Sequence, residues 1–285
     1  MIHRRTLHSI EFTKVIERLA ALCLSPNGRE KALAILPLPD AEAVDRARAL
    51  YEESGTWMAA PETERNFSFS AFTDVEGFLD AARGPRFTPD TEAFWALRDM
   101  LGKAKSAHES ITAASGVRDW PNLYEMARSR PLPVQLTAAL FRCISDDALI
   151  KDESSPELYR LRGEIRALHR NCMNKVRDFA VQYNFAVYLQ DEFMTLSQDR
   201  YVLPLKATYK ARMQGIIHDW SQTGETCYFE PLFLVELNNR LQELKHEEHE
   251  EEQNVLDYLR TLLLAELDAA GGALDLLTEL DVLQA

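Results

Sequence analysis

The sequence predicts a mainly α-helical protein in which a helical core precedes two long antiparallel helices that carry a small antiparallel β-sheet. Three observations predict this fold. Apolar residues recur at helical spacing through the first 150 residues. Two later segments carry a narrow apolar stripe that alternates steps of three and four residues. Between them the composition changes to β-branched and aromatic residues, which favour strands.

Residues 1–150 are expected to form one helical core domain. Ser25 followed by Pro26 is typical of a helix start, and Asp40 can cap the next helix in the same way. Asp74 is expected to open a short helix. The remaining predicted helices of the core cover 7–22, 41–59, 91–115 and 131–145.

Residues 151–285 are expected to form a second domain, built on long helices over about 154–189 and 231–268. A helix of about 33 residues spans on the order of 50 Å, which favours an antiparallel arm. Lys175 and Gln182 interrupt the first stripe, and Glu248 and Glu251 interrupt the second. Where the second stripe is interrupted, we expect the helices to separate or to be bridged by Lys175 or Arg170. The stripe residues are Leu158, Leu161, Ile165, Leu168, Cys172, Phe179 and Ala186 in the first helix, and Leu234, Leu237, Leu241, Leu244, Val255, Leu259 and Leu262 in the second.

The segment between the helices, about 190–230, is expected to fold into three or four antiparallel strands. In the strand over 200–206, alternation would place Tyr201, Leu203 and Leu205 on one face and Arg200, Val202 and Lys206 on the other. Pro204 lacks an amide donor, so it indicates an edge strand or a bulge. The expected strands cover 193–198, 200–206, 213–219 and 225–230.

The charge is unevenly distributed along the chain. The net charge of −13 argues against a general polyanion binder, because an acidic surface repels phosphate. Residues 160–212, however, hold ten basic and five acidic residues, a net charge of +5. Residues 213–285 hold three basic and sixteen acidic residues, a net charge of −13. The middle of the chain is therefore the region that can attract an anion.

A basic cluster near the predicted sheet is the candidate nucleic-acid-binding site. Its members are expected to contact phosphates without sequence preference. The alternative is an ordinary solvated surface. The candidate residues are Arg200, Lys206, Lys210, Arg212 and Tyr209.

Two other groups of residues could suggest chemistry. His246 and His249 are three residues apart on a predicted helix and could share a metal ion, although their spacing differs from H-E-x-x-H. The glutamates around them favour a solvated helix face. His218 and Asp219 are adjacent in a strand and would point to opposite faces, which favours a structural role. We therefore predict no catalytic residue, metal ligand or bound cofactor.

Cellular location can also be predicted from the composition. No apolar run approaches the ~20 residues that cross a bilayer, and the first twelve residues do not form a secretory signal. We expect a cytoplasmic protein with no membrane partner. The four cysteines are scattered without a C-x-x-C pair, so neither disulfides nor a zinc site is expected; they are Cys23, Cys143, Cys172 and Cys227.

Several blocks of sequence resemble the MutS type-two paralogues, the anti-recombination branch of the MutS family. A block near the N-terminus, which includes Ile10-Glu11-Phe12 and residues 25–30, is similar to that family's core. Four blocks in order resemble its clamp region: Arg200-Tyr201-Val202-Leu203-Pro204-Leu205-Lys206, Gly215-Ile216-Ile217-His218-Asp219, Gly224-Glu225-Thr226-Cys227-Tyr228-Phe229-Glu230-Pro231 and Val235-Glu236-Leu237-Asn238-Asn239.

The resemblance implies a core, lever helices and a clamp, followed in a full-length protein by an ATPase domain and a C-terminal Smr nuclease domain. ATP and Mg²⁺ would belong to that ATPase. The 285 residues contain no G-x-x-x-x-G-K-[ST] loop, and Gly102-Lys103 is followed by Ala104. They also lack the F-x-E triplet of mismatch-reading relatives. We expect this chain, as a fragment or a truncated relative, neither to hydrolyse ATP nor to cut DNA.

Two hypotheses of function follow. In the first, the chain is the nucleic-acid-binding lever and clamp of a homodimeric sensor of DNA structure or of collided ribosomes. Its ligand would be branched DNA or ribosomal RNA, in suppression of recombination, DNA repair or ribosome rescue. In the second, the long helices form a dimerisation or assembly module that contacts only protein. An enzymatic reading based on the His/Glu cluster is the weakest.

Overall fold

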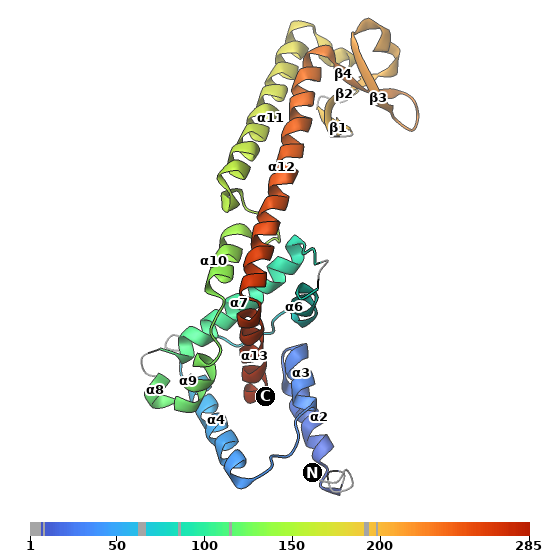
Figure 1. The fold of residues 1–285 in the computed structure, drawn as a ribbon. Coiled ribbons are helices and arrows are strands. Elements are labelled where there is room, and N and C mark those ends of the chain that lie inside the picture. Colours follow the sequence, from blue (N-terminus) through green and yellow to red (C-terminus); the bar gives the residue numbers. More distant parts are fainter. Residues whose placement is uncertain are drawn as a thin grey trace. The chain divides into compact units, whose positions relative to one another are not determined.

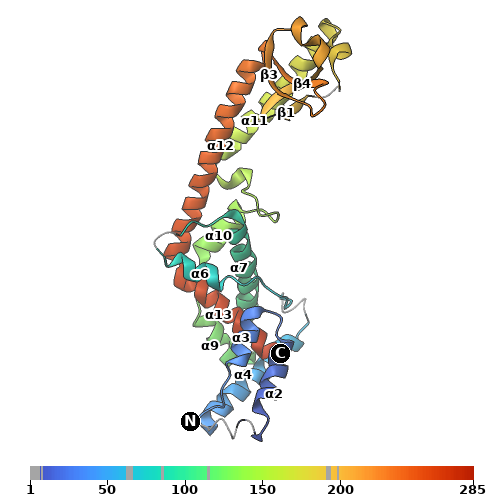
Figure 2. The ribbon, with the colours of Figure 1, turned by 90° about the vertical axis from the view of Figure 1, so that its right-hand side faces the viewer.

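The chain divides into two compact units, which are described separately (Figures 1 and 2). The first contains Met1–Lys151 and Leu256–Ala285, and the second contains Asp152–Val255. The domain prediction placed 256–285 with the lever helices, whereas its contacts group this segment with the first unit. The computed structural model describes residues 7, 9–61, 67–84, 87–113, 116–190, 194–197 and 199–285.

The first unit is a helical assembly centred on α7 and α13. Ser25 Oγ accepts a hydrogen bond from the Gly28 amide at 2.9 Å, and Asp40 caps α4 through the Ala43 amide at 2.8 Å, as predicted. α7 ends at Ile111, and its predicted end at Ser115 lies outside the described residues. The helices are α2 (Phe12–Leu22), α3 (Pro26–Leu33), α4 (Ala41–Ala59), α6 (Glu76–Ala82), α7 (Thr91–Ile111), α8 (Gly116–Asp119), α9 (Pro121–Arg128), α10 (Val134–Cys143) and α13 (Leu267–Gln284).

Helix α13 was not predicted as a separate helix. The second long helix, α12 (Leu232–Ala265), ends three residues before its predicted end, and α13 begins at Leu267. Its buried residues include Ala270, Ala273 and Leu277, and it packs against α3, α4, α6 and α7. The C-terminal residues therefore complete the core of the first unit.

The second unit is built on an antiparallel pair of helices, α11 (Pro156–Gln182) and the part of α12 up to Val255. α11 begins at the Ser155 cap, as predicted, but ends seven residues before residue 189. Asn184 has a φ of 47°, a left-handed conformation that cannot continue a helix. The short 3₁₀ helix η2 (Phe185–Tyr188) follows it, and another, η1 (Asp152–Ser154), precedes α11.

Four antiparallel strands form a sheet in the order β1-β2-β4-β3. Leu203 and Phe229 from the sheet, Cys172 from α11 and Leu234 from α12 share one apolar core, so the sheet packs against the helix pair. The predicted limits at 193 and 198 lie outside the described residues. The strands are β1 (Thr195–Ser197), β2 (Arg200–Lys206), β3 (Gly215–Trp220) and β4 (Thr226–Pro231).

Strand β2 lies between β1 and β4 in the sheet, and Val202, on the face opposite Leu203, is completely buried. Pro204 consequently lies in an interior strand. Its carbonyl accepts a hydrogen bond from the Gln190 amide at 2.8 Å, so its nitrogen also points away from β4. Within the described part of the chain, the isolated bridge Leu189–Leu205 borders that side, and the missing amide donor of Pro204 costs no hydrogen bond to β4.

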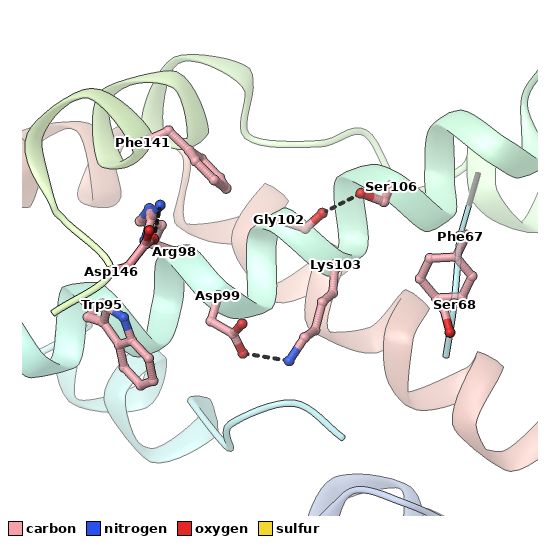
Figure 3. Close-up of a pocket in the computed structure, with 10 residues that line it drawn as sticks. All are labelled: Phe67, Ser68, Trp95, Arg98, Asp99, Gly102, Lys103, Ser106, Phe141 and Asp146. Carbon is pink, nitrogen blue, oxygen red and sulfur yellow. Dashed lines mark hydrogen bonds and ion pairs between the residues drawn. The ribbon is translucent and has the colours of Figure 1, made fainter. Parts of the chain in front are cut away.

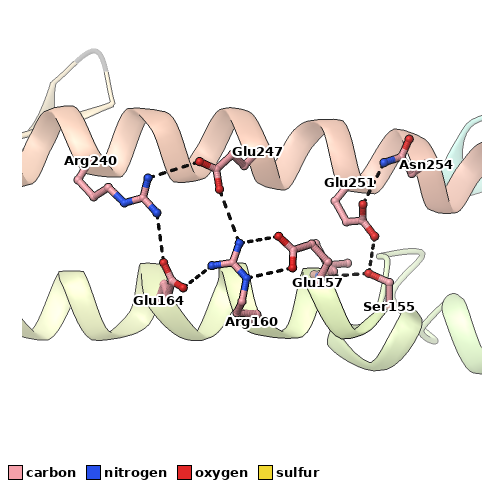
Figure 4. Close-up of polar contacts among 9 residues, drawn as sticks. Ser155, Glu157, Arg160, Glu164, Arg240, Glu247, Glu251 and Asn254 are labelled. Carbon is pink, nitrogen blue, oxygen red and sulfur yellow. Dashed lines mark hydrogen bonds and ion pairs between the residues drawn. The ribbon is translucent and has the colours of Figure 1, made fainter.

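Ion pairs fill the interruption in the apolar stripe of α12 (Figure 4). Arg160 bridges Glu157 and Glu247, and Arg240 bridges Glu164 and Glu247. The helices were predicted either to separate here or to be bridged by Lys175 or Arg170, and that prediction is wrong, because other residues bridge them. The antiparallel register instead places Arg162 opposite Glu248 and Glu252, at 2.7 and 2.6 Å, and Arg162 also contacts Asp152 at 2.9 Å.

Replacing Arg162 by alanine should destabilise the second unit by about 2 kcal/mol, between the values typical of exposed and buried ion pairs. The guanidinium is only 18% exposed and faces three carboxylates, which would repel one another without it. Urea unfolding measures the loss. Arg240→Ala, on the exposed part of the same group of ion pairs, is the control and should cost less than Arg162→Ala. Equal losses for the two variants would contradict this account.

Candidate nucleic-acid interface

Two exposed cations lie on η3 (Ala207–Arg212), the 3₁₀ helix that joins β2 to β3. They are Lys210 and Arg212, and neither has an ion-pair partner among the residues that the structure describes. Lys206 precedes them at the end of β2, and we call residues 206–212 the basic connection. The sequence from Lys206 to His218 contains no carboxylate. This segment therefore carries positive charge and no acidic residue of its own.

Aromatic rings support this basic connection. The Lys210 ammonium lies 5.1 Å from the ring centre of Trp220, and the Arg212 guanidinium lies 5.6 Å from that of Tyr209. Tyr209 packs in turn against Tyr188, with 4.8 Å between ring centres. Cation–π contacts of this kind hold the cations near the surface without neutralising their charge. Lys210, Arg212 and Tyr209, three of the sequence-predicted site residues, are thus brought together.

Lys206 is more constrained than its neighbours. Its side chain is half-buried, and its ammonium donates to the Val187 carbonyl at 3.1 Å. This bond joins the end of β2 to η2. The remaining donors of the ammonium are free to meet an anion, because one carbonyl satisfies only one of three.

Arg200 does not belong to this group, because its side chain is paired with residues of β4 and α12. Its guanidinium forms a two-bond pair with the Glu230 carboxylate, at 2.8 and 2.9 Å, and donates to Asn239 at 2.9 Å. Its side chain is 20% exposed. Because this pairing neutralises the charge, the geometry separates Arg200 from the other predicted residues.

Glu230 is the centre of a buried polar network that the sequence reasoning missed. It is fully buried, and besides Arg200 it accepts a hydrogen bond from Asn238 at 2.7 Å and contacts His218 Nε2. Burial alone raises the pKa of this carboxyl, but the bonds from Arg200, Asn238 and His218 outweigh burial and lower it. The presence of Glu230 beside the apolar residues of β4 was the feature of the sequence that could have indicated this network.

The network also fixes the strand that leads to the basic connection. The Asn238 side chain accepts from the Tyr201 amide at 2.8 Å and donates to the Tyr201 carbonyl at 2.9 Å. His218 stands at an irregularity of β3, where the register shifts between Ile217 and Asp219. In this structure His218 therefore takes part in an internal contact.

An aromatic pocket of about 560 Å³ opens beside Arg212, where residues of α11, η2, η3, β4 and α12 meet. Tyr183 is 58% exposed and Leu232 is 55% exposed, so the pocket is open to solvent. We call it the aromatic pocket. Its lining residues are Phe179, Tyr183, Phe185, Tyr188, Arg212, Met213, Gln214, Pro231, Leu232 and Phe233.

A second pocket of about 490 Å³ lies in the first unit, along α7 (Figure 3). Its charged side chains are paired with one another. Arg98 contacts Asp146 at 2.7 Å and lies over the Phe141 ring, and Lys103 contacts Asp99 at 2.8 Å. This pocket offers neither a net charge nor a nucleophile beside a base.

The other groups considered from the sequence also have definite surroundings. His246 is 74% exposed and lies 3.4 Å from Glu250 on the same helix. In the described parts of the chain, no group of three histidine, cysteine or acidic side chains is arranged to hold a metal ion. All four cysteines are buried free thiols. No helix that the structure describes has both the length and the apolar character of a membrane span.

The fold and the ordered sequence blocks together define a MutS-type lever-and-clamp module attached to a helical core. Comparison with curated proteins identifies the branch. The chain is 42% identical to "Endonuclease MutS2" of Maridesulfovibrio salexigens over 281 residues, which are 99% of this chain and 36% of that protein. It is 40% identical to the protein of that name from Solidesulfovibrio magneticus, and 32% identical to that of Anaeromyxobacter. The chain is homologous to the N-terminal region of MutS2 proteins.

Two further findings describe the extent of this homology. The chain spans about a third of the length of the curated relatives that it matches. No model of a protein family matches the chain.

Proposed function

We propose that the chain is the nucleic-acid-binding lever and clamp of a MutS-like sensor of DNA structure or of collided ribosomes, and that it is not catalytic by itself. One observation carries the proposal. Lys210 and Arg212 are exposed and, among the described residues, free of ion pairs on the sheet connection, in a chain of net charge −13. Homology to MutS2 proteins supports the same function.

The chemistry of the connection suits a phosphate backbone. Its charged groups are a guanidinium and two ammoniums, which bind phosphate without reading bases. In this proposal ATP and Mg²⁺ serve an ATPase domain of the full-length protein, where dimerisation also occurs. The protein acts in the cytoplasm on branched DNA or ribosomal RNA.

Replacing Lys206, Lys210 and Arg212 together by alanine should weaken binding to a four-way DNA junction or to ribosomes. For B-DNA, the slope of log K against log salt changes by roughly 0.9 for each phosphate contact, so it should decrease by about 2 to 3. Fluorescence anisotropy at several salt concentrations measures it.

The control removes the same charge elsewhere. Arg46, Lys105 and Arg128 are exposed cations of the first unit that pair with neighbouring acids. Their alanine variant should keep the wild-type slope. An unchanged slope for the triple variant of Lys206, Lys210 and Arg212 would refute their assignment as phosphate contacts. Salt-independent behaviour of the wild type, with no binding to either ligand, would favour the assembly module that contacts only protein.

A further inference from the structure

We infer that the aromatic pocket receives an unpaired nucleobase whose phosphate is held by Arg212. This inference rests on the proposed function and adds the class of nucleotide that the clamp recognises. It begins from the position of the pocket, which shares Arg212 with the basic connection and lies between the end of α11 and the start of α12.

Five of the ten residues that line the pocket carry aromatic rings. Phe179 packs against Tyr183, with 4.8 Å between ring centres, and against Phe233, with 4.7 Å. Tyr183 at the rim is more than half exposed, and Tyr188 is half-buried. Every nucleobase has a flat aromatic face, and stacking on such rings binds bases with little regard to sequence.

The charges at the pocket favour a nucleotide over other planar ligands. Among the residues that the structure describes, Arg212 is its only charged lining residue, and no carboxylate of these residues lines it. The occupant that complements it is therefore flat and apolar at one end and anionic at the other. Gln214, which is exposed, adds an amide that can hydrogen-bond the edge of a base.

The required occupant must also be unpaired. A base inside a duplex is stacked on both faces and paired at its edge, so it reaches a pocket only after leaving the stack at a cost in free energy. A base in a single strand, a loop or the branch point of a junction does not incur this full cost. The aromatic pocket would therefore give the clamp a preference for unpaired over fully paired nucleic acid.

The test compares the 285-residue chain with its Tyr183→Ala variant. The ligands are single-stranded DNA, single-stranded RNA and a blunt DNA duplex of equal length, each with one 2-aminopurine base. The wild type should bind the single strands more tightly than the duplex and quench the 2-aminopurine. Tyr183→Ala should lose about tenfold in single-strand affinity, while its duplex affinity should stay unchanged. The DNA and RNA arms show which backbone is preferred.

Matched variants separate stacking from damage to the fold. Tyr159 on α11 is 60% exposed, like Tyr183, and does not line the pocket, so Tyr159→Ala should bind as the wild type does. Tyr183→Phe keeps the ring and should restore affinity and quenching.

The two levels of the proposal fail differently. If Tyr183→Ala binds single strands as well as the wild type, while the triple basic variant still weakens binding, the pocket inference is wrong and the proposed function stands. If the wild type binds none of these three ligands, the pocket inference is wrong, and binding to the four-way junction or to ribosomes decides the proposed function. Binding of an aromatic acidic peptide in place of nucleic acid would also overturn the inference.

Discussion

Replacing Glu230 by glutamine should destabilise the second unit by about 3 kcal/mol, because it removes one partner of a buried ion pair. The glutamine retains the size of the side chain but loses the negative charge. Arg200 would then remain 20% exposed beside a neutral amide, and one of the two oxygens that Arg200, Asn238 and His218 contact would become an NH₂ group. Hydrogen exchange measures this loss in peptides from 200–231, separately from the first unit.

A matched substitution nearby provides the control. Glu225 precedes β4, and its side chain is exposed, so Glu225→Gln makes the same chemical change without burial. It should leave protection of the sheet unchanged. The double variant Arg200→Met, Glu230→Gln should recover part of the loss, because no buried charge is then left unpaired. If Glu230→Gln and Glu225→Gln behave alike, the network has no energetic role.

The lowered pKa of Glu230 gives this prediction a pH dependence. A carboxyl with a folded-state pKa below its unfolded value stabilises the fold at pH values above the unfolded pKa, which is about 4.3. That contribution disappears as the pH falls through the folded-state pKa. The difference in stability between the wild type and Glu230→Gln should therefore be full at pH 7 and shrink below about pH 4. An increasing difference at acid pH would contradict the assignment.

Local patterns predicted the elements whose causes are local. The strand over 200–206 has the predicted limits, because an apolar run from Tyr201 to Leu205 ends at each side in a charged residue. Ser25 and Asp40 start their helices as expected. A cap needs only a side-chain oxygen that accepts a hydrogen bond from the amide three residues later.

Properties set by tertiary register could not be predicted in the same way. Arg162, rather than Lys175 or Arg170, faces the glutamates of α12 because the alignment of two distant helices decides the partner. Arg200 has the same charge as Arg212 in the sequence. Only the pairing of β2 with β4 assigns Arg200 to Glu230 and leaves Arg212 exposed. A basic residue near a sheet is therefore a candidate for an interface until its partners are known.

Asp281→Asn should destabilise the first unit by about 3 kcal/mol, because Asp281 joins α13 to the start of α3. The carboxylate is fully buried and accepts from the amides of Leu24 and Ser25, both at 2.8 Å, and from the Ser25 hydroxyl. An asparagine has one acceptor oxygen, so one of these donors would face an NH₂ group and lose its bond. The site has no room for adjustment, since a Cβ on Gly28 would lie 2.1 Å from the Asp281 carboxylate.

Urea unfolding measures the loss of stability caused by Asp281→Asn, and hydrogen exchange should locate it in peptides from 16–33 and 270–285. Asp275 lies on the same helix with an exposed side chain, so Asp275→Asn is the matched control and should cost less than about 0.5 kcal/mol. The sheet of the second unit should keep its protection in both variants, because the hydrogen bonds of Asp281 described above join residues of the first unit. Equal stability of the two variants would show that the junction between α3 and α13 is held by apolar packing alone.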